Sequence, residues 1–301
     1  MAASSERSKA LLALGTISFV WGTTFMASRI GVRFIPGLFL SGLRQLIAGG
    51  LLVIFYIGKG HKIPDKKLLG KLGVLSIFML VIGNGLSTWS VQYISSGLCA
   101  IIAAMLPLWI ALFSLFIIKN TQITKGIITG LVLGFIGVIM IFYDSIHGAI
   151  STAFIFGVIL EVVSMLSWAV GSIYTSKFDL SGVNILFAVG IEMLMAGVAL
   201  MVICALSGHT ADLNNIPREG WLSLAYLVGF GSLIGFGCYT YALSQLPPSQ
   251  VSVYAYINPI IAVALGWAIL DERISAAVLI GAAVTIAGVY LVNKGFRSQL
   301  G

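Results

Sequence analysis

Two long apolar runs near the C-terminus constrain what this chain can fold into. They cover residues 249–270 and 274–293, and the charged turn Asp271-Glu272-Arg273 separates them. A helix rises ~1.5 Å per residue, so about 20 apolar residues cross the ~30 Å hydrocarbon core of a bilayer. Each run is long enough to span a membrane, and the pair predicts a helical hairpin.

The composition indicates an integral membrane protein. Hydrophobic residues make up 59% of the 301 positions and charged residues only 9%. The mean hydropathy is +1.06, so too few polar residues are present to cover a soluble core. The net charge of +7 does not indicate a nucleic-acid partner, because the basic residues lie between apolar runs. We expect the lipid bilayer to surround the protein, and no nucleic acid to bind it.

Ten apolar runs predict an all-α fold with ten transmembrane helices. The first run is longer than the apolar region of a usual signal peptide, so we expect it to stay in the membrane. Most loops are short, which places sequence neighbours side by side. The predicted helices cover residues 10–31, 38–58, 72–93, 96–118, 126–143, 153–176, 183–206, 220–243, 249–270 and 274–293.

The C-terminal hairpin has a counterpart earlier in the chain. Pro107 and Pro259 lie in the middle of apolar runs, 152 positions apart. Two glycine pairs follow at the same spacing of seven: Gly130 with Gly137, and Gly281 with Gly288. Further matches lie upstream, where Gly83-Asn84-Gly85 aligns with Gly235-Phe236-Gly237, and Gly42 and Gly49 align with Gly190 and Gly197. The chain is a duplication, with one repeat over residues 1–148 and another over 149–301.

Each repeat holds five helices, and this odd number has a mechanical consequence. An odd number of crossings turns the second repeat upside down relative to the first. Two inverted five-helix repeats are an architecture by which carriers open a central site to each side of the membrane in turn. The pattern therefore predicts a transporter.

The basic residues predict the orientation of the helices. With a cytoplasmic N-terminus, twelve Lys and Arg residues lie inside and four outside, which satisfies the positive-inside rule. Both termini then face the cytoplasm. The inside set is Arg7, Lys9, Lys59, Lys62, Lys66, Lys67, Lys71, Lys119, Lys125, Lys177, Lys294 and Arg297, and the outside set is Arg29, Arg33, Arg218 and Arg273.

At both hairpins the chain resembles the EamA family of the drug/metabolite transporter superfamily. That family has ten helices in two inverted repeats, which typically end in a proline-containing helix, a Leu-Gly-Glu turn and a glycine-rich helix. Here the second turn reads Leu270-Asp271-Glu272, with Asp271 where the family often has Gly. The first repeat has no acidic residue at Ile118–Ile123. Trp21-Gly22 and Arg44 also resemble the first-repeat pattern.

The resemblance implies a secondary carrier of a cell inner membrane that exports small metabolites without ATP hydrolysis. Amino acids, their analogues, dyes and drugs are the substrates that it implies. No G-x-x-x-x-G-K-[ST] sequence occurs, which agrees with a carrier that hydrolyses no nucleotide. A facilitator or importer on the same fold is the alternative, because inverted repeats permit either direction.

Three charged residues inside predicted spans are candidates for substrate binding or ion coupling: Arg44, Glu161 and Glu192. A cation at the bilayer centre costs ~2.5–3.5 kcal/mol, so Arg44 needs a partner or an interior position. From the helical rise, Arg44 lies ~9 Å and Glu161 ~12 Å below the outer face. We therefore expect an Arg44–Glu161 contact. Glu192, ~10 Å from the inner face, is the better candidate for a proton-coupling group, although either carboxylate could simply bond to neighbouring helices.

Polar and aromatic residues at helix interruptions are further candidates. Asn84 lies between two glycines, where loosely wound backbone could bind a zwitterion or merely let helices approach. Asn258 and Tyr254 lie beside Pro259, and we interpret Pro107 and Pro259 as hinges. Trp21 and Trp168 hold equivalent places in the two repeats and could stack on a flat substrate, although packing explains most such residues.

No motif indicates an enzyme or a cofactor. The sequences H-E-x-x-H and G-x-S-x-G are missing, and Cys99, Cys204 and Cys238 are too far apart for a disulfide framework or a metal cluster. The three histidines, His61, His147 and His209, fall in predicted loops, away from any membrane proton relay. We expect a small-molecule substrate, no metal, no cofactor, and protons as a candidate coupling ion.

Overall fold

The computed structural model describes residues 2–117, 124–146, 151–175, 182–246, 251, 254–272 and 275–297. The first-repeat turn at residues 118–123, the repeat boundary at residues 148–149, and His147, Lys177, Ser249 and Arg273 lie outside them. Within the described residues the chain is all-helical, with no strand. The prediction of an all-α fold is confirmed.

Ten helical stretches account for the described chain, and they match the ten predicted spans. Those of the first repeat are α1 (Ala2–Gly31), α2 (Gly37–Gly58), α3 with η1 and α4 (Lys66–Leu75, Ser76–Asn84, Gly85–Ser90), α5 with α6 (Ser96–Ala103, Leu106–Ile117) and α7 (Lys125–Ile146). Those of the second are α8 (Thr152–Thr175), α9 (Ile185–Ser207), α10 with η3 and α11 (Arg218–Tyr226, Leu227–Ile234, Gly235–Gln245), α13 (Tyr254–Leu270) and α14 (Ala276–Arg297). A short 3₁₀ turn, η2 (Leu213–Asn215), precedes α10.

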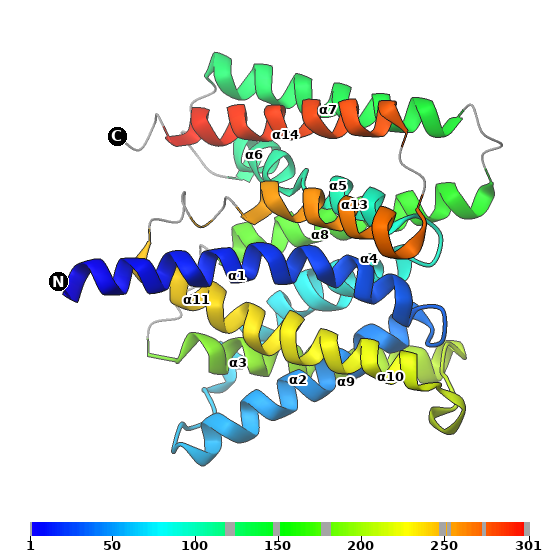
Figure 1. Cartoon of the computed structure of the whole chain (residues 1–301). Helices are drawn as coiled ribbons and strands as arrows, with labels where there is room; N and C mark the ends of the chain where they lie inside the picture. Colours follow the sequence, from blue (N-terminus) through cyan, green and yellow to red (C-terminus); the bar gives the residue numbers. More distant parts are fainter. Residues whose placement is uncertain are drawn as a thin grey trace.

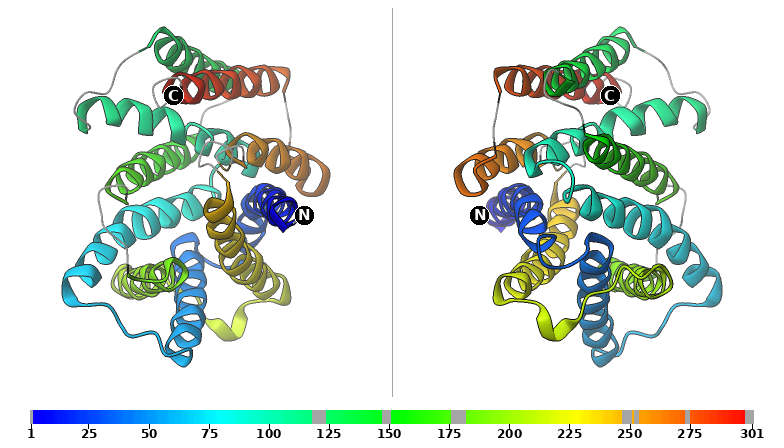
Figure 2. Two further views of the ribbon diagram at one scale, coloured as in Figure 1. Left: turned by 90° about the vertical axis from the view of Figure 1, so that its left-hand side faces the viewer. Right: turned by 90° about the vertical axis from the view of Figure 1, so that its right-hand side faces the viewer.

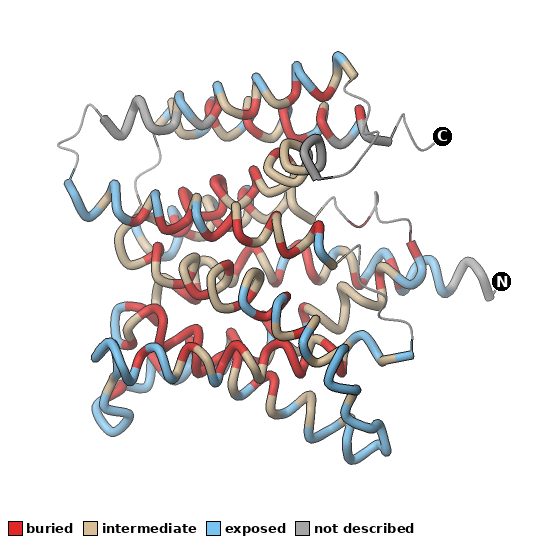
Figure 3. Tube along the Cα trace, turned by 180° about the vertical axis from the view of Figure 1, so that it is seen from behind, coloured by how far each residue is buried: buried red, intermediate tan, exposed pale blue. Residues whose placement is uncertain are grey.

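The outer surface of the bundle suits a lipid environment. Six stretches are long and apolar enough to cross a membrane, and four shorter apolar helices accompany them in the described chain. Large apolar side chains are exposed on this surface, among them Ile54, Ile139 and Trp267, at 72%, 64% and 64% of full exposure. Buried residues concentrate along the middle of the bundle (Figure 3). Both termini lie at the same end of the bundle (Figure 1).

Equivalent helices of the two repeats pack against each other through the glycines that revealed the duplication. α7 and α14 lie side by side at one edge of the bundle (Figures 1 and 2). A Cβ atom on Gly130 would come within 2.6 Å of the Gly288 carbonyl oxygen, and one on Gly137 within 2.5 Å of the Gly281 carbonyl oxygen. Only glycine permits backbones to approach this closely. The crossing is thus symmetric, as inverted repeats require.

The same arrangement joins α2 to α9. A Cβ atom on Gly49 would lie 2.8 Å from the Gly190 carbonyl oxygen, and one on Gly197 would lie 2.6 Å from the Leu46 Cα atom. Glycines at matched repeat positions therefore form the close contacts in both of these helix pairs.

The third helix of each repeat contains a π-helical stretch. In the first repeat it is η1, which ends at Asn84, and in the second it is η3, which ends just before Gly235. π-Helical turns widen the backbone and often occur at functional sites. The π-helical turn η1 agrees with the loosely wound backbone predicted around Asn84. η3, at the equivalent position of the second repeat, is π-helical as well.

The two prolines affect their helices differently. Before Pro107 the helix breaks at Ala104 and Met105, which separate α5 from α6. Pro259 lies inside the continuous helix α13. An interruption of the helix therefore accompanies Pro107 alone, and the hinge role of both prolines stays a prediction.

Candidate functional site

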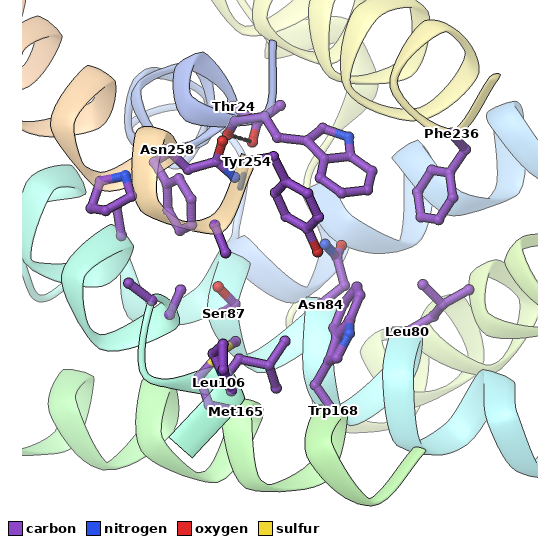
Figure 4. Close-up of a pocket in the computed structure, with 18 of the residues that line it drawn as sticks. Thr24, Leu80, Asn84, Ser87, Leu106, Met165, Trp168, Phe236, Tyr254 and Asn258 are labelled. Carbon is purple, nitrogen blue, oxygen red and sulfur yellow. Dashed lines mark hydrogen bonds between the residues drawn. The ribbon is translucent and has the colours of Figure 1, made fainter. Parts of the chain in front are cut away.

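A cavity of about 460 Å³ lies in the middle of the bundle, between the two repeats. Figure 4 shows side chains from several helices pointing into it. The first repeat contributes Trp21, Thr24, Phe25, Arg44, Gln45, Leu80, Asn84, Ser87, Ala100, Ala103, Ala104, Leu106, Pro107 and Ile110. The second contributes Met165, Trp168, Phe236, Tyr254, Ala255, Asn258 and Pro259. This volume suits a small molecule.

Six of the eight predicted binding or coupling residues line this cavity: Trp21, Arg44, Asn84, Trp168, Tyr254 and Asn258. The predicted hinges Pro107 and Pro259 line it as well. Glu161 and Glu192 do not belong to the lining. The proline-containing helix of each hairpin, α5 with α6 in the first repeat and α13 in the second, contributes to the wall.

Each of the two cavity tryptophans packs on a glycine of the opposite repeat. A Cβ atom on Gly83 would lie 2.9 Å from Cε3 of Trp168, and one on Gly235 would lie 3.0 Å from Cδ1 of Trp21. Gly83 and Gly235 are repeat equivalents, and so are the two tryptophans. The inverted duplication therefore places two matched indole rings in the cavity wall, each seated beside a π-helical stretch.

Aromatic rings surround Trp21. Its ring centroid lies 5.0 Å from that of Tyr254, 5.4 Å from that of Phe236 and 5.3 Å from that of Tyr239. The Trp21 indole nitrogen donates a hydrogen bond to the Gly231 carbonyl at 3.1 Å. These contacts hold the ring in place, and they give this part of the cavity an apolar, aromatic wall.

Arg44 lines the cavity and has no acidic partner among the described residues. Its Nε donates a hydrogen bond to Ser232 Oγ at 3.0 Å, and its side chain is only 7% exposed. A guanidinium has five N–H donors, so one hydrogen bond leaves most of its donor capacity free for the cavity.

The predicted Arg44–Glu161 contact is wrong. Glu161 instead accepts hydrogen bonds from Ser87 Oγ at 3.1 Å and Ser90 Oγ at 2.6 Å, and it is fully buried. The two ion pairs between described residues are Lys9–Glu6 and Arg29–Glu272. Helix rise gives depth along the membrane normal but no rotation about the helix axis, so matching depths did not place the two side chains on facing surfaces.

Glu192, the repeat counterpart of Arg44, lies on α9 away from the cavity. It is 9% exposed, and its backbone carbonyl accepts a hydrogen bond from Ser76 Oγ at 2.9 Å. Glu161, unlike Glu192, is connected to the cavity wall by a hydrogen bond. Ser87 lines the cavity and donates this bond to the Glu161 carboxylate.

Asn84 lies at the centre of a polar network. Its Oδ1 accepts hydrogen bonds from Ser41 Oγ and Gln45 Nε2, both at 3.0 Å. These two donors fix the orientation of the amide and leave its nitrogen free. Figure 4 shows the Asn84 amide near the Tyr254 hydroxyl and the Trp168 ring. Oε1 of Gln45 is buried and has no hydrogen-bond partner, although Gln45 lines the cavity. This oxygen is therefore a buried acceptor at the cavity wall that no described protein group satisfies.

Asn258 ties α13 to α1. In the amide orientation that suits its neighbours, the side-chain nitrogen donates to the Tyr254 carbonyl at 3.0 Å and to the Ser18 carbonyl at 2.8 Å. The amide oxygen is then left without these partners, on a residue that lines the cavity. Asn258 thus combines a structural role with an acceptor at the site.

Several lining residues were not predicted from the sequence, and the repeat could have revealed one of them. Phe236 aligns with Asn84 in the duplicated glycine motif, and both line the cavity. Gln45 directly follows Arg44, but this adjacency alone did not predict a shared cavity. Ser87 and Met165 carried no signal, because Ser and Met are common inside transmembrane helices.

Comparison with known proteins agrees with this geometry. A model of the EamA-like transporter family matches residues 8–143 and again residues 155–294. The chain belongs to the EamA-like transporter family. Members of this family are transporters, so the protein is a multi-pass membrane transporter and not an enzyme.

Relatives of this EamA-like transporter occur in several organisms. It is 35% identical over 286 residues to the uncharacterized inner membrane transporter YedA of Escherichia coli (strain K12), covering 94% of this chain and 90% of YedA. It is 25% identical to the uncharacterized transporter YoaV of Bacillus subtilis (strain 168), covering 97% of this chain and 99% of YoaV. A crystal structure of another protein shares the fold with a TM-score of 0.65, at 18% identity over 98% of this chain and 99% of that one.

Proposed function

We propose that the protein is a secondary active transporter that exports small metabolites, amino acids or related compounds and drugs among them, by alternating access. The observation that carries this proposal is the cavity between the repeats, because Trp21 and Trp168, and Pro107 and Pro259, line it as matched pairs. Inverted repeats with a central site are the architecture of alternating-access carriers.

The proposed orientation places both termini in the cytoplasm. The termini share one end of the bundle (Figure 1), and most basic residues fall in the loops expected at that end. The likeness to an inner membrane transporter of Escherichia coli supports a bacterial inner membrane as the location. Export then runs from the end that bears the termini to the opposite end.

We further propose protons as the coupling ion. The sequence favoured Glu192 as the titrating group, but the structure favours Glu161, because Ser87 connects its carboxylate to the cavity wall. A buried carboxylate that exchanges a proton when the cavity changes its access would couple the two fluxes. Glu192 stays in the proposal as the second candidate.

Efflux and counterflow experiments test the export function. Cells that express the protein are challenged with toxic amino-acid analogues, organic acids and dyes, and accumulation is compared with that in cells expressing Arg44→Ala. Arg33→Ala is the matched control, because Arg33 is exposed in the loop after α1. We expect lower accumulation with the parent and Arg33→Ala proteins only. If no compound accumulates less and reconstituted vesicles show no counterflow, the export function is wrong.

The same vesicles separate an exporter from a facilitator or importer. Imposing a proton gradient drives a coupled exporter to concentrate substrate against its gradient. A facilitator only equilibrates the substrate, and an importer moves it in the opposite direction.

A further inference from the structure

The charge of the cavity wall is unbalanced. Arg44 is the charged residue among the described lining residues, and none of them is Asp or Glu. The Glu161 carboxylate is connected to the cavity wall through Ser87 but does not line the cavity. It is fully buried and accepts hydrogen bonds from the hydroxyl groups of Ser87 and Ser90. An uncompensated cation in a low-dielectric site is unfavourable. The cavity wall therefore carries a positive charge that a bound anion would neutralise.

Hydrogen-bond donors gather around the same space. The Asn84 amide nitrogen is left free by the two bonds to its oxygen. The Trp168 indole and the Tyr254 hydroxyl extend toward this amide (Figure 4), and the Arg44 guanidinium adds its remaining N–H groups. Four residues can thus donate to one ligand, whereas the side-chain acceptors of the lining, which are the amide oxygens of Gln45 and Asn258 and the hydroxyl oxygens, are all neutral. Neutral oxygens can hydrogen-bond an uncharged donor but cannot balance an ammonium charge.

We propose that the cavity selects organic monoanions, carboxylates above all, over zwitterions and cations of the same size. Counted over the lining side chains alone, a monoanion brings the cavity to net neutrality, with its carboxylate at Arg44 and Asn84 and its apolar body against Trp21, Trp168 and Phe236. A zwitterion leaves the net charge at +1, and a cation raises it to +2. This inference rests on the proposed transport function and, within its substrate range, ranks compounds that lack an ammonium group above amino acids.

A matched series of ligands tests the selection. 3-Phenylpropionate, phenylalanine and 2-phenylethylamine share the 2-phenylethyl group and differ in their charged groups. Binding to the purified full-length protein is measured by quenching of tryptophan fluorescence, since Trp21 and Trp168 line the cavity. We expect the propionate to bind at least about tenfold more tightly than the other two, because the amine lacks the carboxylate and the ammonium group of phenylalanine meets no anionic partner among the lining residues. Octanoate is added as an aliphatic carboxylate in case the ring does not fit.

Three variants place the effect at Arg44. Arg44→Gln should remove the preference for the carboxylate, Arg44→Lys should keep part of it, and Arg33→Gln should leave it unchanged. If Arg44 had only a structural role, Arg44→Lys would not retain a preference that depends on the charge of the ligand. Equal or tighter binding of phenylalanine or the amine, retention of the preference in Arg44→Gln, or no binding of either carboxylate would each overturn the proposal.

Counterflow in vesicles separates this inference from the transport function. Carboxylate binding with Arg44-dependent preference but without counterflow supports the site and refutes transport. Counterflow of phenylalanine or phenylethylamine at rates equal to that of the propionate supports transport and refutes the selection.

Discussion

The carboxylate of Glu272 accepts hydrogen bonds from the backbone nitrogen of Ser96 at 2.8 Å and from its hydroxyl at 2.9 Å. Glu272 lies in the turn after α13, in the second repeat, and Ser96 begins α5, in the first. Gly97 N also donates to Glu272 at 3.3 Å, and Arg29 Nε lies 4.0 Å from its carboxylate. The acidic residue of the family-like turn thus caps a helix of the opposite repeat, where a negative charge is favoured by the helix dipole.

We predict that this contact holds the repeats together at the end away from the termini. Glu272→Gln keeps the shape but removes the charge, and Glu272→Ala removes the acceptor. A charge-assisted hydrogen bond contributes about 1.5–3 kcal/mol, so opening of that end should become at least about tenfold more favourable. The measurement is labelling of Ala103→Cys, a cavity position, by a membrane-impermeant maleimide added outside intact cells.

Asp271→Asn provides the matched control for the Glu272 variants. Asp271 is exposed and has a φ of 54°, a conformation that Asn also tolerates. Its labelling rate should equal that of the parent. If Glu272→Ala is also labelled at the parent rate, the contact does not control opening.

A second prediction concerns the α7–α14 crossing. A Cβ atom on Gly288 would lie 2.6 Å from the Gly130 carbonyl oxygen, so Gly288→Ala forces the two backbones apart. Overpacking of this kind costs typically ~1–3 kcal/mol, and the melting temperature in detergent should fall. Gly50→Ala is the control, because nothing lies within 4 Å of its Cβ position, and it should keep or raise the melting temperature. Equal melting temperatures for both variants would contradict the close approach.

A third prediction concerns the indole of Trp168 in the cavity wall. A Cβ atom on Gly83 would lie 2.9 Å from Trp168 Cε3, so Gly83→Ala should displace the ring toward the cavity. We expect a higher KM in counterflow, with a melting temperature closer to that of the parent than Gly288→Ala shows. Gly237→Ala, where the Cβ position has nothing within 4 Å, should leave the KM unchanged. A parent-like KM for Gly83→Ala would show that the ring does not contribute to substrate binding.

A fourth prediction distinguishes the two buried carboxylates. If Glu161 carries the coupling proton, Glu161→Gln should flatten the dependence of transport on external pH, because the amide does not titrate. Glu192→Gln should then keep the parent profile. The reverse result would restore the assignment that the sequence favoured, and two unchanged profiles would eliminate both carboxylates as coupling groups.

The sequence predicted the fold almost entirely, and the physical reason is the membrane. Every backbone group inside a bilayer needs an internal partner, so long apolar runs must be helices. The edges of α2 (Gly37–Gly58) and α9 (Ile185–Ser207) fall within two residues of the predicted 38–58 and 183–206. α1 begins eight residues earlier than predicted, at Ala2, because a polar extension of a helix carries no hydropathy signal.

The repeat also predicted pairs of equivalent residues, and two of these pairs line the cavity. Trp21 with Trp168, and Pro107 with Pro259, both line it. Equivalence follows from the duplicated chain, and the inverted symmetry then brings the matched positions to one central space.

Only the tertiary structure decided which charged residues meet. Arg44 and Glu161 lie at similar predicted depths, yet one bonds to Ser232 and the other to Ser87 and Ser90. Glu272 belonged to a recognisable turn, but nothing in the sequence connected it to Ser96. Hydrophobic length and repeat spacing determine where a residue lies along the membrane normal, whereas the rotation and packing of helices determine its partners, and these depend on side chains from all ten helices at once.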